Sequence, residues 1–257
     1  MNRVRLLTVP AVAGAALVLA AAPALASSTA SGSAQADLQP VPVNDAPGVG
    51  QAMVEVDGTT LSFMLESTGL LADAPHAAHI HYGEDSMNAC PTADADADGD
   101  GFLTTTEGAP AYGSIVVSLT TEGDTSPDSG LAVDRFGVGE EISYSRGDVE
   151  VSADVAEDIV SGEAVVVVHG VDHDGDGAYS EGERGASDLD PSLPGEATDP
   201  ALCGVLQASQ MGEMPAGGVQ TGEAQATTGG VALAAGGAVA LAGGALLLAR
   251  RRTADQA

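Results

Sequence analysis

Three of the five histidines of this chain stand close together, at His76, His79 and His81. Side chains alternate between the two faces of a β-strand, so His79 and His81 would project from the same face of an extended segment. Two imidazoles on one face can bind a single copper, zinc, iron or nickel ion, and the pair alone does not select among these metals. The alternative is a pair of surface histidines on an edge strand.

An acidic run after the histidines matches a twelve-residue calcium-binding loop. In such a loop the ligands stand at the first, third, fifth, seventh, ninth and twelfth positions, and a glycine at the sixth permits a sharp turn. Residues 96–107 place Gly101 at the sixth position. The predicted ligands are Asp96, Asp98, Asp100, Phe102 through its carbonyl, Thr104 and Glu107.

The same pattern recurs in residues 172–183, with Gly177 at the sixth position. Its predicted ligands are Asp172, Asp174, Asp176, Ala178 through its carbonyl, Ser180 and Glu183. Two matches predict two Ca²⁺ sites, and the alternative is a pair of solvated acidic turns. Four valines precede the second loop and favour a strand, so we expect both loops to lie in connections between strands.

The N-terminus is typical of a secretory signal peptide. Two arginines, an apolar run over residues 9–22 and the small-residue sequence Ala24-Leu25-Ala26 predict a signal peptide over residues 1–26. Residues 27–45 are rich in Ser, Ala, Pro and Gln, and this composition predicts a flexible leader. The chain is therefore expected to be exported.

The C-terminus combines an apolar segment with a basic tail. Residues 231–249 carry no charge, and a helix of that length spans about 28 Å, close to the thickness of a bilayer. Three arginines follow directly and place the tail, residues 250–257, in the cytoplasm. We expect a transmembrane anchor, with residues 209–230 as a flexible spacer. The alternative is wall attachment through a sorting signal, although Gln220-Thr221-Gly222 departs from the Leu-Pro-x-Thr-Gly pattern.

The chain is strongly acidic. It has 8 basic and 37 acidic residues, no lysine and a formal net charge of −29 at pH 7. Between the terminal segments the only cationic side chains are Arg135, Arg146 and Arg184. Such a charge repels nucleic acid and favours divalent cations. We therefore expect metal ions, and no nucleic acid, as partners. The two terminal segments, and not the charge, predict a location on a bacterial cell surface.

The region between the two ends has a β pattern. Apolar and polar residues alternate on both sides of Asp57-Gly58, which predicts a hairpin. Further strands are expected over residues 114–119, 141–144, 149–152 and 164–169. Cys90 and Cys203 are the only cysteines, and an exported protein is expected to pair them in a disulfide, with metal-binding thiols as the alternative. The sequence predicts an all-β sandwich or barrel.

Three short motifs together resemble Cu/Zn superoxide dismutase and its relatives, including CHRD (chordin-type) domains. They are His76-Ala77-Ala78-His79-Ile80-His81 with Cys90, then Val167-Val168-His169-Gly170, then Cys203-Gly204-Val205-Leu206. The resemblance implies a Greek-key β domain over residues 46–208 and a Cys90–Cys203 disulfide. It also implies that His79, His81 and His169 bind Cu²⁺ and that His76 is structural.

The departures from the dismutase pattern leave the activity open. A full two-metal site needs six histidines, whereas this chain has five, and Pro200 stands where the family has its substrate-steering arginine. Three functions remain: a surface-anchored domain that binds Ca²⁺ and copper without strong catalysis, an active copper-only superoxide dismutase, and an adhesion or structural module stiffened by Ca²⁺. The sequence does not establish whether the chain is an enzyme.

Overall fold

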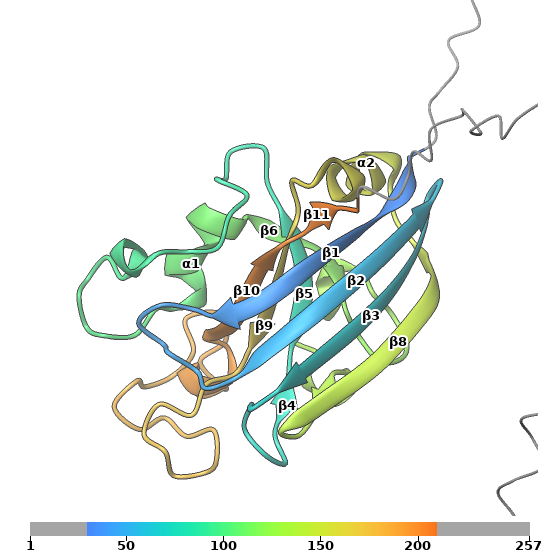
Figure 1. Cartoon of the computed structure of the whole chain (residues 1–257). Coiled ribbons are helices and arrows are strands. Elements are labelled where there is room, and N and C mark those ends of the chain that lie inside the picture. Colours follow the sequence, from blue (N-terminus) through green and yellow to red (C-terminus); the bar gives the residue numbers. More distant parts are fainter. Residues whose placement is uncertain (1–29, 210–257) are drawn as a thin grey trace, which may run out of the picture. The chain divides into compact units, whose positions relative to one another are not determined.

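The structure, a computed structural model, describes residues 30–209, which are mostly β (Figure 1). The strands are β1 Ser31–Pro40, β2 Val49–Asp57, β3 Thr60–Thr68, β4 Pro75–His76, β5 Ala78–Tyr82, β6 Ser114–Ser118, β7 Gly137–Val138, β8 Glu141–Glu150, β9 Val165–His169, β10 Pro200–Val205 and β11 Gln207–Ala208. The helices are α1 Thr105–Tyr112 and α2 Ala153–Ser161, with short 3-10 turns η1 Ala93–Ala95, η2 Pro127–Ser129, η3 Val133–Arg135 and η4 Gly195–Ala197.

One antiparallel sheet of nine strands dominates this part of the chain. Its order is β6-β5-β9-β10-β1-β2-β3-β8, with β11 also pairing with β1, while β4 and β7 form a separate pair. The sheet curls, as Figure 1 shows. Side chains of β8 reach across to the chain that follows β6: the Tyr144 hydroxyl donates to the carbonyl of Leu119 at 2.5 Å, and Arg146 donates to the Thr120 hydroxyl at 2.7 Å. The two edge strands are thus linked without backbone pairing.

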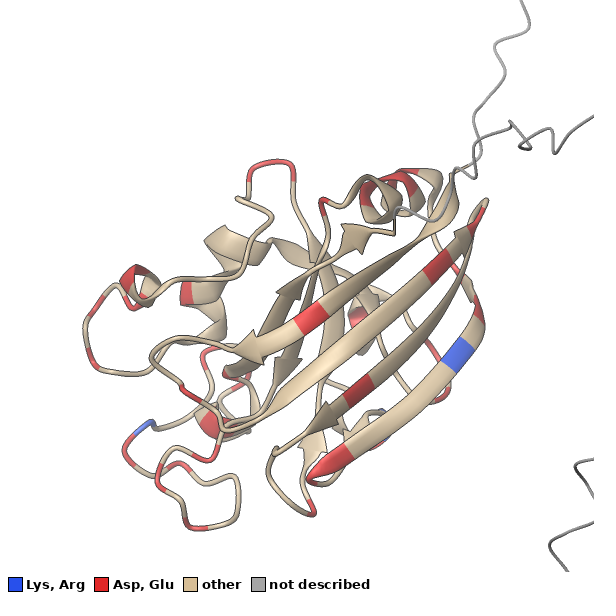
Figure 2. Ribbon diagram, in the orientation of Figure 1, with Lys and Arg blue, Asp and Glu red and all other residues tan. Residues whose placement is uncertain are grey.

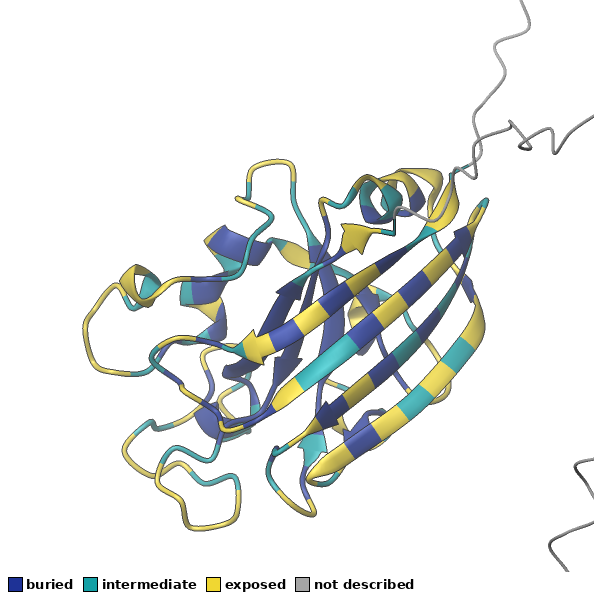
Figure 3. Cartoon of the chain, viewed as in Figure 1, coloured by how far each residue is buried: buried dark blue, intermediate teal, exposed yellow. Residues whose placement is uncertain are grey.

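The inside of the curled sheet is the hydrophobic core. Alternate residues of β1, β2 and β3 are buried and exposed along each strand, which Figure 3 shows as alternating bands. Leu38, Val54 and Phe63 are examples from the three strands, each at most 3% exposed. Most outward positions of these strands are polar or charged, although Val49 and Met53 of β2 are exposed as well. Acidic residues lie both on strands and in loops (Figure 2). The alternation of apolar and polar residues along each strand therefore determines which face of the sheet is buried.

Strand β9 is buried on both faces. Val166 and Val168 belong to the main core, whereas Val165 and Val167 pack in a second apolar cluster with Leu103 and Tyr112. This second cluster lies on the outer face of the sheet, where the β5–β6 connection that carries α1 covers it. The face of β9 that bears odd-numbered residues is therefore shielded from solvent.

The structure confirms the predicted β character at the level of a curled antiparallel sheet. The hairpin at Asp57-Gly58 is confirmed, since β2 and β3 pair from Asp57↔Thr60 to Val49↔Thr68 and Gly58 adopts a φ of 67°. One predicted gap between strands is absent: residues 141–144 and 149–152, expected as two strands, belong largely to one continuous strand, β8. Helix α2 was not expected; Ser152 caps its first turn and it buries Ala156 and Ile159.

The predicted flexible leader is wrong for residues 31–40. These residues form β1, which pairs with β2, β10 and β11 and buries Ala34, Ala36 and Leu38. The composition of this segment resembles that of a flexible leader, because small polar residues stand between the buried ones and the alternation of buried and exposed positions is not evident from composition. The predicted signal peptide, the spacer beyond residue 209, the apolar segment 231–249 and the basic tail lie outside the described residues. Within the described residues, no helix is long and apolar enough to cross a membrane.

Candidate metal centre

Strands β5 and β9 bring three histidines together. They pair antiparallel with His79 opposite Val167 and His81 opposite Val165, so both histidines share the face of β9 that His169 also occupies. One nitrogen atom from each ring lies within 4.8 Å of the corresponding atoms of the other two. All three side chains are buried, with at most 4% exposure. The geometry brings together all three histidines predicted to bind a transition metal.

Backbone carbonyls fix the orientation of the three rings. His79 contacts the carbonyl of Gly130 through Nε2 at 3.0 Å, His81 that of Gly113 through Nδ1 at 3.1 Å, and His169 that of Thr198 through Nδ1 at 2.6 Å. Because a carbonyl only accepts, each of these nitrogens carries the proton and donates. The opposite nitrogen of each neutral ring therefore presents a lone pair.

The three lone-pair nitrogens have no protein partner. The Nδ1 of His79 and the Nε2 atoms of His81 and His169 are buried and make no hydrogen bond among the described residues. Buried polar atoms are rarely left unpaired, and each such atom normally has a bound partner. Three converging imidazole lone pairs, each ring anchored by its second nitrogen, form the donor set of a transition-metal site. The residues present thus fit a metal ion.

Burial also keeps these rings neutral, each with a single N–H. It lowers the pKa of His81 to about 3, and the proximity of His169 acts in the same direction. The pKa of His79 is lowered well below its ordinary value, first by burial and then by its two neighbours. For His169, burial outweighs the opposing hydrogen bond to Thr198 and lowers the pKa. Neutral imidazole is the form that binds metal, so the centre is prepared for a metal at neutral pH.

The other two histidines lie outside this group. His76 contacts the carbonyl of Leu71 through Nε2 at 3.0 Å and the hydroxyl of Tyr179 through Nδ1 at 2.9 Å, so both of its nitrogens have partners. His173 contacts Asp199 through Nε2 at 3.1 Å. Both histidines are partnered within the protein and do not belong to the group of three, although the Nδ1 of His76 also lies 3.1 Å from the backbone carbonyl of His169.

A pocket opens above the three histidines. It has a volume of about 510 Å³ and is lined by residues from the connections β5–β6, β6–β7 and β9–β10. Its walls are mainly apolar, and Asp128 is the one lining residue besides the histidines that can carry a charge. A metal held by the three rings would therefore be reached through an apolar opening.

The first acidic loop brings three of its six predicted ligand residues close together. Asp96 accepts from the backbone N–H groups of Gly99 and Gly101, at 2.8 and 3.2 Å. The carboxylate of Glu107 accepts from the N–H groups of the second and ninth loop residues, Ala97 and Thr104, both at 3.0 Å. Helix α1 begins directly after Thr104 and turns Glu107 back toward the loop. Oxygen atoms of Asp96, Asp98 and Glu107 lie within 4.8 Å of one another.

The second acidic loop has the same hydrogen bonds with a different glutamate. Asp172 accepts from Gly175 and Gly177 at 2.8 and 3.0 Å. Here the carboxylate that accepts from the second and ninth loop residues belongs to Glu196: His173 donates at 2.9 Å and Ser180 at 2.7 Å. Oxygen atoms of Asp172, Asp174 and Glu196 form the close group.

The structure therefore corrects the predicted twelfth position of the second loop. Glu183 is exposed and does not belong to the group of Asp172 and Asp174. A turn, rather than a helix, follows Ser180, so Glu183 is not turned back toward the loop as Glu107 is in the first. Glu196, 1% exposed on η4, takes that place. No spacing in the sequence identifies Glu196.

Comparison with known protein families identifies the fold family. A model of the CHRD domain matches residues 26–178, more than half of the chain. The chain belongs to the CHRD domain family. The match begins before β1 and ends within the second acidic loop, while the sheet continues through β10 and β11. No curated protein matches the chain.

Solved structures similar to this CHRD domain include superoxide dismutase 5 of Candida albicans. Its copper(II) form has a TM-score of 0.39 and 15% identity, over 73% of this chain and 99% of that one. Two single-residue mutants of the same enzyme have TM-scores of 0.39, with 15% and 16% identity, and also match over 73% of this chain.

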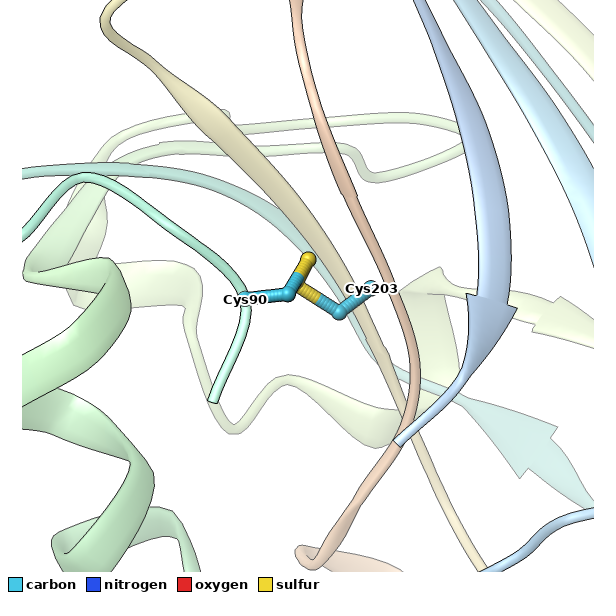
Figure 4. The surroundings of a disulfide bond; sticks show 2 residues. All are labelled: Cys90 and Cys203. Atoms are coloured by element: carbon cyan, nitrogen blue, oxygen red, sulfur yellow. A yellow bond between two sulfur atoms is a disulfide. The ribbon is translucent and has the colours of Figure 1, made fainter. Parts of the chain in front are cut away.

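A disulfide joins the β5–β6 connection of the CHRD domain to β10. Cys90 and Cys203 are bonded, with their Cα atoms 5.7 Å apart and 113 residues between them in sequence (Figure 4). This confirms the expected pairing and excludes both thiols as metal ligands. Val165 and Val167 of β9 belong to the same apolar cluster as Cys203, so the disulfide links the connection that covers this cluster to β10.

Two buried residues with structural roles near the centre were missed. Asp199 is fully buried and paired with Arg184, whose Nε lies 2.6 Å from its carboxylate. Asn44 is buried and binds the backbone of Leu103 and the carbonyl of Pro200. Pro200, at the place of the dismutase arginine, lies in β10, and Arg184 does not line the pocket. Neither Asp199 nor Asn44 stands in a motif, so no local pattern identifies them.

Proposed function

We propose that this CHRD domain is an exported metal-binding module that holds copper at His79, His81 and His169. The observation that carries the proposal is the convergence of three buried lone-pair nitrogens without protein partners. Neutral imidazoles suit copper and zinc, and among divalent first-row metals Cu²⁺ binds such ligands most tightly. We infer, from the motifs that carry the resemblance, that the curled sheet has the Greek-key connections of the dismutase fold.

The test of the copper centre is metal stoichiometry together with spectroscopy. The full chain, loaded with Cu²⁺ and dialysed, is expected to retain one copper ion and to give an electron paramagnetic resonance spectrum with nitrogen couplings. His79→Ala should lose the ion, whereas His76→Asn, which removes a partnered histidine, should retain it if the protein folds. Copper retained equally by His79→Ala would contradict the proposal.

We do not extend the proposal to superoxide dismutation. Superoxide is an anion, and no arginine or lysine lines the pocket above the histidines. The strongly negative chain would also slow the approach of an anion. The copper-loaded chain is expected to remove superoxide no faster than His79→Ala in the same assay.

We further propose that the two acidic loops bind Ca²⁺. The proposal is supported by the equivalent hydrogen bonds of Glu107 and Glu196, which set one carboxylate in each loop opposite two aspartates. Glu196 would supply the carboxylate that the sequence pattern assigned to Glu183. Calorimetric titration of the full chain with Ca²⁺ is expected to give two sites, and Asp96→Ala and Asp172→Ala one site each.

Export and surface attachment are also part of the proposal. They are supported by the signal-peptide pattern of residues 1–26, by the apolar segment 231–249 and by the disulfide, which is typical of oxidising compartments. Mass spectrometry of the protein from its native cells is expected to find an N-terminus at Ser27. The protein should fractionate with the cell envelope, and deletion of residues 231–257 should release it into the medium.

A further inference from the structure

The pocket above the three histidines has a size and lining that suit an organic molecule rather than a diatomic anion. Its volume of about 510 Å³ falls within the range of small-molecule sites, roughly 300–1,000 Å³. Ile115, Leu131, Val133 and Leu189 contribute to its walls. A site for superoxide alone would require neither this volume nor these side chains.

Three exposed apolar side chains of the domain lie together at this opening. Among residues 30–209, seven large hydrophobic side chains are exposed, and three of them, Leu131, Val133 and Leu189, line the pocket. They come from two different connections, β6–β7 and β9–β10. Exposed apolar side chains that gather around a cavity mark a binding site, because a bound apolar molecule removes them from water.

The charge of the pocket disfavours anions. Asp128 is its one acidic lining residue, and no arginine or lysine lines it. The histidines at its base carry no compensating positive charge in their neutral form. An anionic ligand would lose its hydration without gaining an opposite charge.

The three histidines supply polar atoms at the base of the pocket, and Thr105, Ser114 and Thr198 are the hydroxyl-bearing residues of its lining. The free nitrogens of His79, His81 and His169 present only lone pairs and are buried at this base, so the ligand group that suits them is one that donates a hydrogen bond or binds a metal held by the rings, and a hydroxyl can do both. An apolar body with one hydroxyl would satisfy both the walls and the base.

We propose that this pocket binds a neutral, mainly apolar molecule carrying a single hydroxyl group, with the hydroxyl directed at the three-histidine centre. The inference deepens the proposed function, on which it rests for the metal, by naming the class of ligand that the same site takes. It assigns Leu131 and Val133 a direct role in ligand affinity, in addition to the histidines.

The test compares two probes of matched shape, 4-ethylphenol and the anion 4-ethylbenzoate, by calorimetry on the full chain. Both the metal-free and the copper-loaded protein are expected to bind 4-ethylphenol at least tenfold more tightly than 4-ethylbenzoate. Val133→Ser should weaken 4-ethylphenol binding roughly fivefold through lost apolar contact. Val138→Ser is the matched control, because Val138 is exposed on β7 and does not line the pocket; its affinity should equal that of the unmodified protein.

The outcomes separate this inference from the proposed metal function. Binding of 4-ethylphenol to the metal-free chain, weakened by Val133→Ser and not by Val138→Ser, would support the pocket even if copper failed to bind. Retention of copper with no 4-ethylphenol binding would overturn the inference and leave the metal centre intact. Equal affinity for the two probes, or equal loss in the two serine variants, would also overturn it.

Discussion

The Nδ1–H of His169 donates to the backbone carbonyl of Thr198 at 2.6 Å, two residues after Glu196. The short segment from Glu196 to Thr198 thus serves two groups: its glutamate completes the second acidic loop, and its carbonyl orients a histidine of the metal centre. The hydroxyl of Thr105, at the start of α1, also donates to this carbonyl at 2.5 Å. The proposed calcium and copper sites are therefore joined through one backbone segment.

The first prediction concerns the identity of the second-loop glutamate. Glu196→Gln should abolish Ca²⁺ binding at the second loop, because it removes a buried anionic oxygen from the group that faces Asp172 and Asp174. Glu183→Gln is the matched control and should leave two sites with unchanged affinity, since Glu183 is exposed outside the group. Calorimetric titration of both variants measures the number of sites. Loss of a site in Glu183→Gln alone would contradict the assignment.

The second prediction concerns coupling between the two metals. Saturating Ca²⁺ should raise the affinity for Cu²⁺ by roughly tenfold, because an ordered Glu196 segment holds the Thr198 carbonyl that orients His169. Competition against a chromogenic copper chelator, in calcium-free and calcium-saturated buffer, measures this factor. By linkage, Cu²⁺ should raise the affinity of the second loop for Ca²⁺ by the same factor.

The control for this coupling is again the pair of glutamine variants. Glu196→Gln should make copper affinity independent of Ca²⁺ at the second loop, and Glu183→Gln should behave as the unmodified protein. An identical calcium effect in both variants would show that the coupling does not pass through Glu196.

The third prediction concerns the pH dependence of stability in the metal-free chain. The pKa of His81 in the folded protein is about 3, whereas in the unfolded chain it is about 6.5. Below pH 6.5 the unfolded chain therefore binds a proton that the folded chain does not, and the free energy of unfolding falls as the pH falls. Between pH 7 and pH 5 the contribution of His81 is a loss of about 2 kcal/mol.

Urea unfolding at a series of pH values measures this loss. His81→Gln does not titrate at this position, so its stability should fall by about 2 kcal/mol less over the same interval. The comparison uses the difference between the two pH values within each protein, and a general destabilisation of the variant does not affect it. Parallel pH profiles for the two proteins would refute the assignment.

The fourth prediction concerns the buried ion pair of Arg184 and Asp199. Arg184→Leu should lower the free energy of unfolding by about 3 kcal/mol, because it leaves the fully buried carboxylate of Asp199 without its arginine. The double variant Arg184→Leu/Asp199→Leu removes the stranded charge and should recover part of that loss. Chemical denaturation of the two variants tests the pair. A double variant less stable than Arg184→Leu would contradict this account.

The sequence by itself determined the features that depend on short-range periodicity. The alternation around Asp57-Gly58 defines the β2–β3 hairpin, and the spacing of His79 and His81 places both rings on one face of β5. The two acidic loops were identified because their aspartates and glycines follow one another at fixed intervals. Each of these features is encoded within a dozen residues, which is the range over which strand and turn geometry act.

Only the tertiary structure decided the contacts that join distant segments. It placed Glu196 in the position predicted for Glu183, and it paired the predicted leader, as β1, with β2 and β10. It also determined which nitrogen of each histidine carries the proton, because that nitrogen donates to a backbone carbonyl of another segment. The residues around Glu196, around residues 31–40 or around these carbonyls do not indicate which distant group each will contact. These partners are fixed when the curled sheet brings β1, β9 and β10 side by side, because burial then requires every polar group to find an acceptor, a donor or a metal.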